Sequence, residues 1–173
     1  QVLSADGRFL YLLGEMSGEI AVFSRDASSG ALTLIERVSS LPPNTPLRPG
    51  IPRVPSGVEE TATIDLNTLI WCADLLITPD GQHLYSTERT RDHISCLRID
   101  PHHGRLQFLH QTSTERQPRG IACDAHGRYL ISSGEQSDRL SLFRRDPHSG
   151  ELARVQRIEV GAGANWIQVV HPT

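Results

Sequence analysis

Charged residues occupy one equivalent position in each of three repeated segments of the chain. Eight residues after each of three spaced glycines come Glu15, Arg89 and Glu135. Two further charged residues, Asp74 and Arg119, lie where inner strands are expected to begin. Acids and bases that alternate around one face of a repeat protein can bind and polarise a polar substrate. The same charges can also be solvated loop residues, and the spacing leaves both interpretations open.

The elements that must position these residues are repeats of antiparallel strands. Three segments, which begin at Ser4, Thr78 and Asp124, share one pattern of apolar and polar residues. Each has two turn glycines 23 residues apart: Gly7 and Gly30, Gly81 and Gly104, Gly127 and Gly150. Around these glycines the residues alternate with the period of half-buried strands, and units of four strands are typical of β-propeller blades. A β-sandwich is the alternative, but it does not explain the fixed glycine spacing.

This pattern predicts an all-β fold with three four-stranded antiparallel blades and one closing strand. We expect the blades at about 1–40, 72–115 and 117–161, and the closing strand at 165–170. In a propeller such a strand pairs with an N-terminal segment and closes the ring. The sequence therefore predicts part of a propeller. Its open blade faces would need further N-terminal blades or self-association to be covered.

One long link interrupts the regular spacing. The stretch 41–71 contains LPPNTPLRPGIPRVP, whose prolines disfavour a helix or a central strand. Because consecutive strands alternate in direction, this link is expected at the same end of the blades as Glu15, Arg89 and Glu135, which we call the top face. The link is either a lid over a site or an excursion on the surface.

Composition limits the partners and the kinds of chemistry. The net charge is −3 and 38% of the residues are hydrophobic, so neither nucleic acid nor a membrane is expected as a partner. Three cysteines without a C-x-x-C spacing indicate a reducing, cytoplasmic environment. The eight histidines lack an HExxH or H-x-H spacing, and there is no G-x-S-x-G elbow. The sequence thus predicts neither a metal site nor a cofactor nor a serine nucleophile.

Three stretches of the chain resemble one family of β-propellers. The segment ADLLITPDGQHLYSTERTRDHISCLRIDPHHGRL resembles the repeat of the seven-bladed lactonase family. FLYLLGEMSGEIAVF and QPRGIACDAHGRYLISSGEQSDRLSLFRRDPHSGEL resemble other parts of the same pattern. The family includes 6-phosphogluconolactonase of the bacterial propeller type and is similar to fungal carboxy-muconate cyclase. The resemblance implies the last three of seven blades and hydrolysis of a small anionic sugar lactone, such as 6-phosphogluconolactone, without a cofactor.

The resemblance also implies roles for individual residues. Glu15 and Arg89 match the family's blade glutamate and arginine and form the implied catalytic pair. Glu15 would activate a water molecule, and Arg89 would bind an oxyanion or another anionic group. Arg119, Asp74 and Glu135 are the implied substrate-binding residues.

The chain departs from the family pattern beside these positions. Gly14, Glu88 and Gly134 stand where the family has asparagine, and Glu135 stands where it has glutamine. Two other functions therefore stay open. One is a non-catalytic propeller that acts as a binding or scaffold module, and the other is a lactone-forming cyclase of the muconate type.

Overall fold

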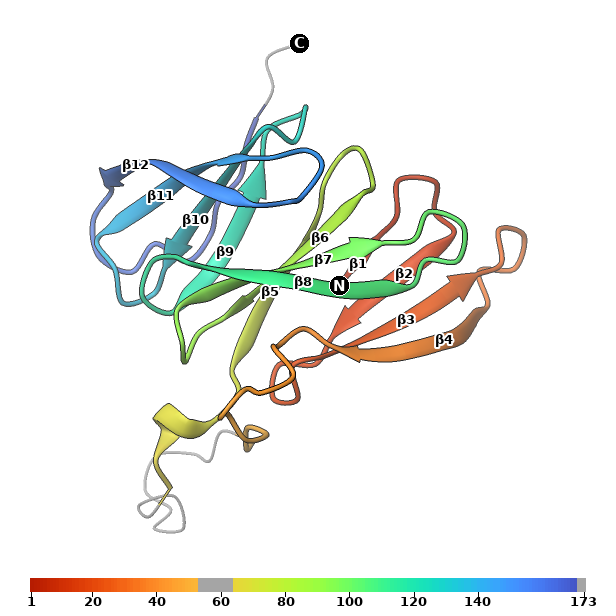
Figure 1. Cartoon of the computed structure of the whole chain (residues 1–173), viewed down its shortest axis with the longest axis horizontal. Coiled ribbons are helices and arrows are strands. Elements are labelled where there is room, and N and C mark those ends of the chain that lie inside the picture. Colours follow the sequence, from red (N-terminus) through yellow and green to blue (C-terminus); the bar gives the residue numbers. More distant parts are fainter. Residues whose placement is uncertain (53–63, 171–173) are drawn as a thin grey trace.

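The computed structural model describes residues 1–52 and 64–170, which form three four-stranded antiparallel sheets placed side by side as blades (Figure 1). Blade 1 contains β1 (Val2–Leu3), β2 (Phe9–Leu13), β3 (Glu19–Arg25) and β4 (Leu32–Ser39). Blade 2 contains β5 (Cys72–Ile77), β6 (His83–Glu88), β7 (His93–Ile99) and β8 (Leu106–Ser113). Blade 3 contains β9 (Pro118–Cys123), β10 (Tyr129–Gly134), β11 (Arg139–Arg145) and β12 (Leu152–Glu159).

Each blade is a meander in which consecutive strands are hydrogen-bonded neighbours. In all three blades the register between the third and fourth strands shifts at the same place, after Val22, Cys96 and Leu142. Such a bulge adds local twist to the outer strands of a sheet. The prediction of three repeated four-stranded blades is confirmed, and the repeat extends to this irregularity.

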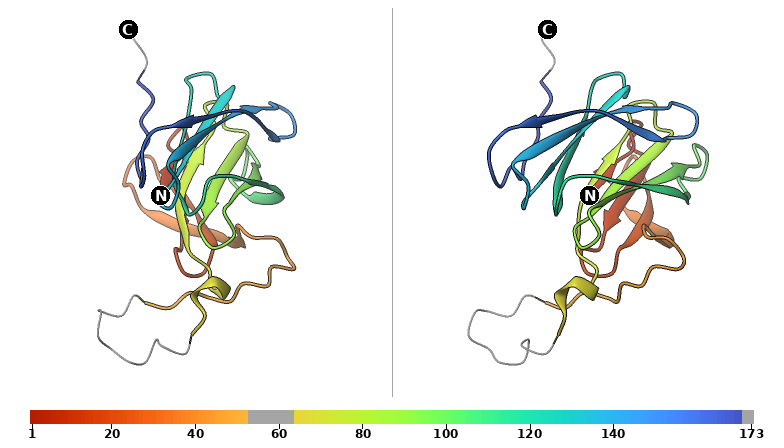
Figure 2. Two further views of the ribbon diagram at one scale, coloured as in Figure 1. Left: turned by 90° about the vertical axis from the view of Figure 1, so that its left-hand side faces the viewer. Right: turned by 60° about the vertical axis from the view of Figure 1, so that its left-hand side comes forward.

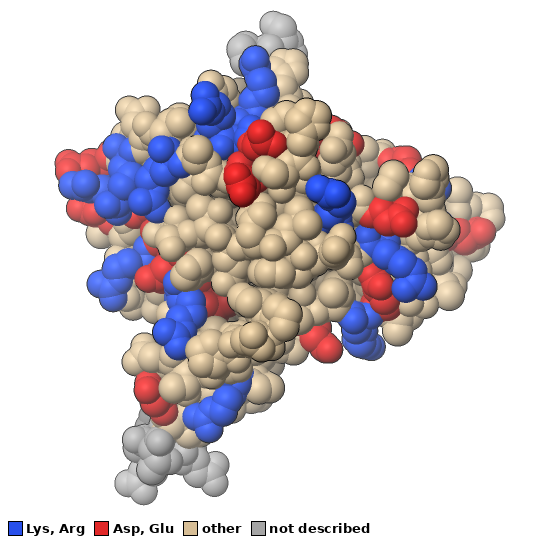
Figure 3. Space-filling model, viewed as in Figure 1, with Lys and Arg blue, Asp and Glu red and all other residues tan. Residues whose placement is uncertain are grey.

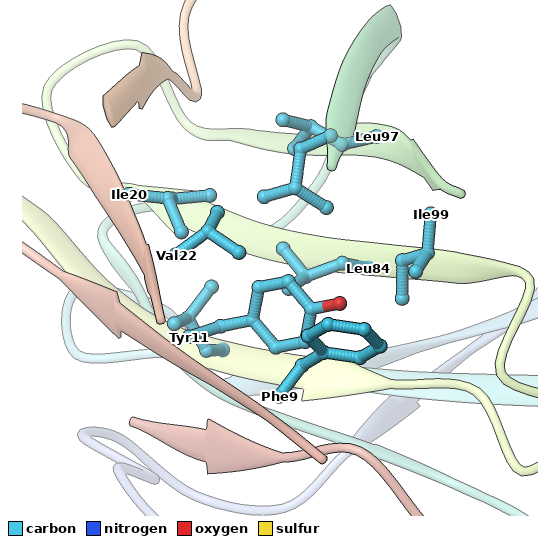
Figure 4. Packing of buried hydrophobic residues seen from close by; sticks show 9 residues of the cluster. Phe9, Tyr11, Ile20, Val22, Leu84, Leu97 and Ile99 are labelled. Atoms are coloured by element: carbon cyan, nitrogen blue, oxygen red, sulfur yellow. The ribbon is translucent and has the colours of Figure 1, made fainter. Parts of the chain in front are cut away.

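Two apolar clusters hold the blades together. The first joins blades 1 and 2 and includes Phe9, Tyr11, Ile20, Val22, Leu84, Leu97 and Ile99 (Figure 4). The second joins blades 2 and 3 and consists of Tyr85, Ile94, Cys96, Ile121, Leu130, Phe143 and Leu152. A hydrogen bond is repeated at both interfaces, because a buried tyrosine hydroxyl needs a partner. Tyr11 donates to the Gly104 carbonyl at 3.0 Å, and Tyr85 donates to the Gly150 carbonyl at 2.7 Å.

Blade 2 is covered on both sides, whereas the outer blades have an open side. All residues of β6 are buried, but every residue of β12 after Leu152 is exposed. Large apolar side chains that remain between 40% and 50% exposed include Leu3, Leu12, Leu32 and Leu34 in blade 1 and Tyr129, Val155 and Ile158 in blade 3. In the view of Figure 3, acidic and basic side chains lie towards the rim and the middle carries few charges. The outer blades therefore present apolar surface that a neighbouring blade could cover.

We expect the isolated 173-residue chain to self-associate through these open faces. Each large apolar side chain contributes about 1.5–3 kcal/mol when it is fully buried, so covering several of them offsets the entropy lost on association. Sedimentation velocity at several concentrations measures this. The variant Leu12→Glu/Ile158→Glu should shift the population towards monomer. A compact wild-type monomer that unfolds cooperatively would contradict the prediction.

The pairing predicted for the closing strand at 165–170, with an N-terminal segment of the ring, stays a prediction. Residues 164–170 have no regular secondary structure. Their backbone passes over the face of β9, where a Cβ atom on Gly120 would lie 3.0 Å from the Asn165 carbonyl oxygen and 3.5 Å from the Ile167 nitrogen. Strands pair along the edge of a sheet and not across its face, so this segment adds no strand to blade 3.

The described flanks of the long link lie beside the turn that carries Glu15. The Gly50 nitrogen donates to the Met16 carbonyl at 2.7 Å, and the Cys72 nitrogen donates to the Glu15 carbonyl at 2.8 Å. The flanks carry the 3-10 helix η2 (Leu66–Thr68) and extend away from the blades (Figure 2). The tip at 53–63, on which a lid would depend, lies outside the described residues. No helix in the described ranges is long or apolar enough to cross a membrane.

Candidate active site

Four charged residues from the three blades form a continuous row of ion pairs. Arg89 Nη2 lies 2.5 Å from Glu15 Oε1, and Arg89 Nη1 lies 3.9 Å from Glu135 Oε2. Arg119 Nη1 lies 3.1 Å from the same Glu135 oxygen. Negative and positive charges thus alternate along the row, from Glu15 in blade 1 to Arg119 in blade 3.

The blade repeat brings these residues together. Glu15, Arg89 and Glu135 each follow the second strand of their blade. Arg89 and Glu135 come directly after β6 and β10, and Glu15 comes two residues after the end of β2. Arg119 belongs to the inner strand β9. Because each blade repeats the same strand pattern, equivalent positions in the sequence become neighbours at the top face.

A cavity of about 650 Å³ lies against this row and is lined by Glu15, Asp74, Arg89 and Arg119. Cys72, Gly120 and the C-terminal segment 165–167 complete part of its wall. Its size is in the range that holds small-molecule ligands. The structure therefore places four of the five residues selected from the sequence in one cavity. The fifth, Glu135, is bound to two of them.

The two central residues differ in their access to water. The Arg89 side chain is 5% exposed, and its Nε donates to the Trp71 carbonyl at 3.3 Å while its Cζ lies 5.8 Å from the Trp71 ring centre. The Glu15 side chain is 54% exposed, so solvent reaches its carboxylate. A fixed, dehydrated cation beside a hydrated carboxylate can stabilise developing negative charge while the carboxylate accepts a proton.

Asp74 lines the cavity and also joins two blades. It lies at the register irregularity of β5 between Cys72 and Leu75. Its Oδ1 accepts a hydrogen bond from the Leu75 nitrogen at 2.9 Å, and its Oδ2 accepts one from the Ile121 nitrogen of β9 at 3.1 Å. Both carboxylate oxygens thus already bind backbone, which fixes the inner strands of blades 2 and 3 relative to each other.

Glu88, one of the departures from the family pattern, fixes the turn that presents Arg89. Its side chain is buried, and its Oε1 accepts hydrogen bonds from the Trp71 nitrogen at 3.0 Å and the Thr90 nitrogen at 3.1 Å. Its Oε2 accepts one from the Arg91 nitrogen at 2.8 Å. The carboxylate therefore stabilises local backbone, and among the described residues it forms no ion pair with Arg89. The residues next to Glu88 in the sequence do not indicate that its carboxylate stabilises this turn.

Glu115 is a second buried carboxylate that sequence reasoning missed. Arg157 Nε and Nη2 donate to it at 2.8 and 2.6 Å, and the Ser137 and Ser141 hydroxyls donate at 2.7 and 2.6 Å. Burial alone would raise its pKa, but these hydrogen bonds outweigh burial and lower the pKa of Glu115 to about 2. Its partners lie 22 or more residues away in the sequence, so only the folded chain reveals the cluster.

No histidine of the described ranges lines the cavity. His102 and His103 are exposed in the turn after β7, and His83 is buried, with its Nδ1 3.0 Å from Arg145 Nη1. Within residues 1–52 and 64–170, no group of three or more His, Cys, Asp or Glu side chains is arranged to hold a metal ion.

Comparisons with known sequences connect this geometry to one family. The family model described as "Lactonase, 7-bladed beta-propeller" matches residues 1–169. The 6-phosphogluconolactonase of Sodalis glossinidius is 30% identical over 164 residues, which cover 95% of this chain and 43% of that protein. The 6-phosphogluconolactonase of Photorhabdus laumondii is 43% identical over 106 residues, which cover 61% of this chain and 32% of that protein.

Solved structures show the same fold. The periplasmic gluconolactonase of Pseudomonas aeruginosa superposes with a TM-score of 0.72 at 28% identity, covering 94% of this chain and 39% of that one. A putative 6-phosphogluconolactonase from Bacteroides fragilis superposes with a TM-score of 0.74 at 22% identity, again covering 94% and 39%. The chain spans less than half the length of these relatives. Because the family match extends over nearly all of its residues, the chain belongs to the lactonase family of seven-bladed β-propellers.

Proposed function

We propose that the protein carrying this chain hydrolyses a sugar lactone, and that a phosphorylated lactone such as 6-phosphogluconolactone is its preferred substrate. The observation that carries the proposal is the ion pair between Glu15 and Arg89 in the wall of the 650 Å³ cavity. The relatives named as 6-phosphogluconolactonases and the neighbour named as a gluconolactonase support the reaction class.

Glu15 and Arg89 have complementary tasks in this reaction. Glu15 takes a proton from water as the water oxygen attacks the lactone carbonyl carbon. Arg89 donates hydrogen bonds to the carbonyl oxygen, which becomes negative in the tetrahedral intermediate. When the ring C–O bond breaks, the proton on Glu15 passes to the leaving ring oxygen. The product is the open-chain hydroxy acid, and Glu15 is again a carboxylate.

Two atoms in the pair support this division of tasks. Glu15 Oε1 is bound to Arg89 Nη2, while Oε2 has no hydrogen-bond partner within the described ranges and can orient a water. Arg89 Nη1 lies 3.9 Å from Glu135, which is too long for a hydrogen bond. This nitrogen is therefore the donor that can turn to a substrate oxygen.

Variants of the pair test the proposal in the full-length protein. Glu15→Gln should lower kcat by about 100-fold, the lower end of the range for losing a general base. Arg89→Ala should lower kcat/KM for an anionic lactone by about 10- to 100-fold, as expected for one lost charge-assisted hydrogen bond. Proton release during ring opening, corrected for spontaneous hydrolysis, measures both.

The exposed pair Arg139 and Glu159 provides the control. Their side chains are 41% and 75% exposed and belong to blade 3, so Arg139→Gln and Glu159→Gln should leave turnover unchanged. Wild-type turnover in both Glu15→Gln and Arg89→Ala would contradict the assigned roles. Failure of the wild-type protein to open any sugar lactone would contradict the proposed function itself.

A reducing compartment is the proposed location of this reaction. Cys72, Cys96 and Cys123 are free thiols. Burial raises the pKa of the Cys72 thiol to about 12 and that of Cys96 to about 11, so both stay protonated and unreactive. These thiols support a cytoplasmic location, which cell fractionation with an antibody to the protein checks. Recovery in a periplasmic fraction would contradict it.

A further inference from the structure

A second cavity of about 490 Å³ adjoins the first at the top face, since Arg89 belongs to the lining of both. We call it the flank cavity. The side chains that matter for its chemistry are Trp71, Arg89, Asp92, Arg116, Gln117 and Gln136. They come from the end of the long link, the turn after β6, the link before β9 and the turn after β10. All of its blade residues therefore come from blades 2 and 3 and the connections between them.

Arg116 gives the flank cavity a positive charge that no carboxylate of residues 1–52 and 64–170 neutralises. Its Nη2 donates to Gln136 Oε1 at 3.2 Å, and no carboxylate of the described ranges lies within ion-pair distance of it. Arg119, in the first cavity, is instead paired with Glu135 at 3.1 Å. A guanidinium whose side-chain partner among the described residues is a neutral amide can take a phosphate or carboxylate with two parallel hydrogen bonds.

The backbone around Arg116 is held in strained conformations. Asp92 and Gln117 have φ angles of 58° and 50°, and among the described residues they are the non-glycine residues with positive φ. Both line the flank cavity, and the Gln117 nitrogen donates to Asp92 Oδ1 at 2.8 Å. Such strained conformations cluster at binding sites. They point to a pocket that is shaped for a ligand.

Gly134 allows the link with Arg116 to approach blade 3. A Cβ atom on Gly134 would lie 2.1 Å from the Arg116 carbonyl oxygen, so any side chain there would displace the link. On the other side of the cavity, the Trp71 ring lies next to the Arg89 guanidinium. The cavity thus combines an unneutralised cation with an aromatic wall beside the central arginine.

We propose that the flank cavity binds the charged substituent of the substrate, a phosphate or a carboxylate, and so sets the preference for anionic over neutral lactones. Arg116 is the cation that holds this group, and Trp71 packs against the carbon chain that links it to the ring. The lactone ring then lies in the first cavity, between Glu15 and Arg89. This inference rests on the proposed function and names the group that determines its specificity.

A binding experiment tests the flank cavity without catalysis. The chain has two tryptophans, so Trp166→Phe leaves Trp71 as the one fluorescent reporter of the cavity in this chain. In that background, 6-phosphogluconate should change the emission at a concentration at least about 10-fold lower than gluconate does, and Arg116→Gln should remove this difference. Equal responses to the two acids, or an unchanged preference in Arg116→Gln, would overturn the proposal.

A kinetic comparison in the full-length protein separates this proposal from the proposed function. Arg116→Gln should raise KM for the phosphorylated lactone by about 10- to 100-fold, with kcat and the kinetics of neutral gluconolactone nearly unchanged. A carboxylated lactone, run in parallel, shows which anionic group is preferred. The control variant is Arg105→Gln. Arg105 lies in the turn before β8, is exposed, and is paired with Glu36.

The outcomes of this comparison are distinguishable. If the wild type opens both lactones but Arg116→Gln keeps the same preference, the flank cavity proposal is wrong and the proposed function stands. If the wild type opens neither lactone, the proposed function is wrong, and the fluorescence of Trp71 still decides whether the cavity selects the phosphorylated acid.

Discussion

Replacing Gly150 by alanine should lower the free energy of unfolding by about 3 kcal/mol or more, whereas the same change at Gly30 should lower it by only about 1 kcal/mol. Both glycines have a φ of 75°, so the backbone strain added by a side chain is the same. A Cβ atom on Gly150 would lie 2.6 Å from Cys96 Sγ and 2.6 Å from His83 Cδ2. Nothing lies within 4 Å of the corresponding position at Gly30.

The neighbours of Gly150 cannot move aside easily. Cys96 and His83 are both buried, and His83 is held by Arg145 at 3.0 Å. Gly104, whose φ is 68°, provides a second case, because a Cβ atom there would lie 2.4 Å from the Phe9 ring. Urea denaturation of the three alanine variants at one protein concentration measures the differences. Equal losses at all three glycines would contradict the prediction.

Replacing Glu115 by alanine should lower the free energy of unfolding by about 2–3 kcal/mol, because it leaves buried hydroxyl donors without an acceptor, whereas the Arg157 side chain is 44% exposed and can be rehydrated. The Ser137 and Ser141 hydroxyls would lose their acceptor, and Arg157 would lose both of its short hydrogen bonds. The exposed pair Arg139–Glu159 is the control, and Arg139→Ala should change stability by at most about 1 kcal/mol. A similar small effect at Glu115 would show that the cluster does not stabilise blade 3.

Glu115 also predicts how stability depends on pH. Its pKa is about 2 in the folded chain, below the ordinary value of 4.5. The unfolded chain therefore binds the proton more readily, so the contribution of Glu115 is fully present above pH 4.5 and is lost as the pH falls towards 2. Denaturation curves at several pH values should show this loss in the wild type and much less of it in Glu115→Gln.

The blades, and the common location of the charged residues at one end of them, could be predicted from the sequence. The glycine spacing fixed the length of each repeat, and the alternating strand directions placed Glu15, Arg89 and Glu135 at one end of the blades. Repeats give this kind of prediction because equivalent positions lie in equivalent places, whatever their partners are. The roles of these residues in catalysis stay predictions until the variants are measured.

Other features depend on contacts that no local pattern encodes. Glu88 is visible in the sequence only as a departure from the family pattern, and the structure shows that its carboxylate binds three backbone nitrogens. The anion-binding role proposed for Arg116 has no signal in the sequence. It depends on the absence of a nearby carboxylate in the described ranges and on the close approach that Gly134 permits.

The tyrosine hydrogen bonds between blades give the arc a polarity, with a donor on blades 1 and 2 and an acceptor in the turn of the blade that follows. Tyr11 and Tyr85 pair in register with Val22 and Cys96, and the residue that pairs with Leu142 at the equivalent place in blade 3 is Ile131. Isoleucine has no hydroxyl, so a joint formed after blade 3, with another blade or with a second copy, lacks this hydrogen bond. That joint should therefore open more readily than the two joints within the arc.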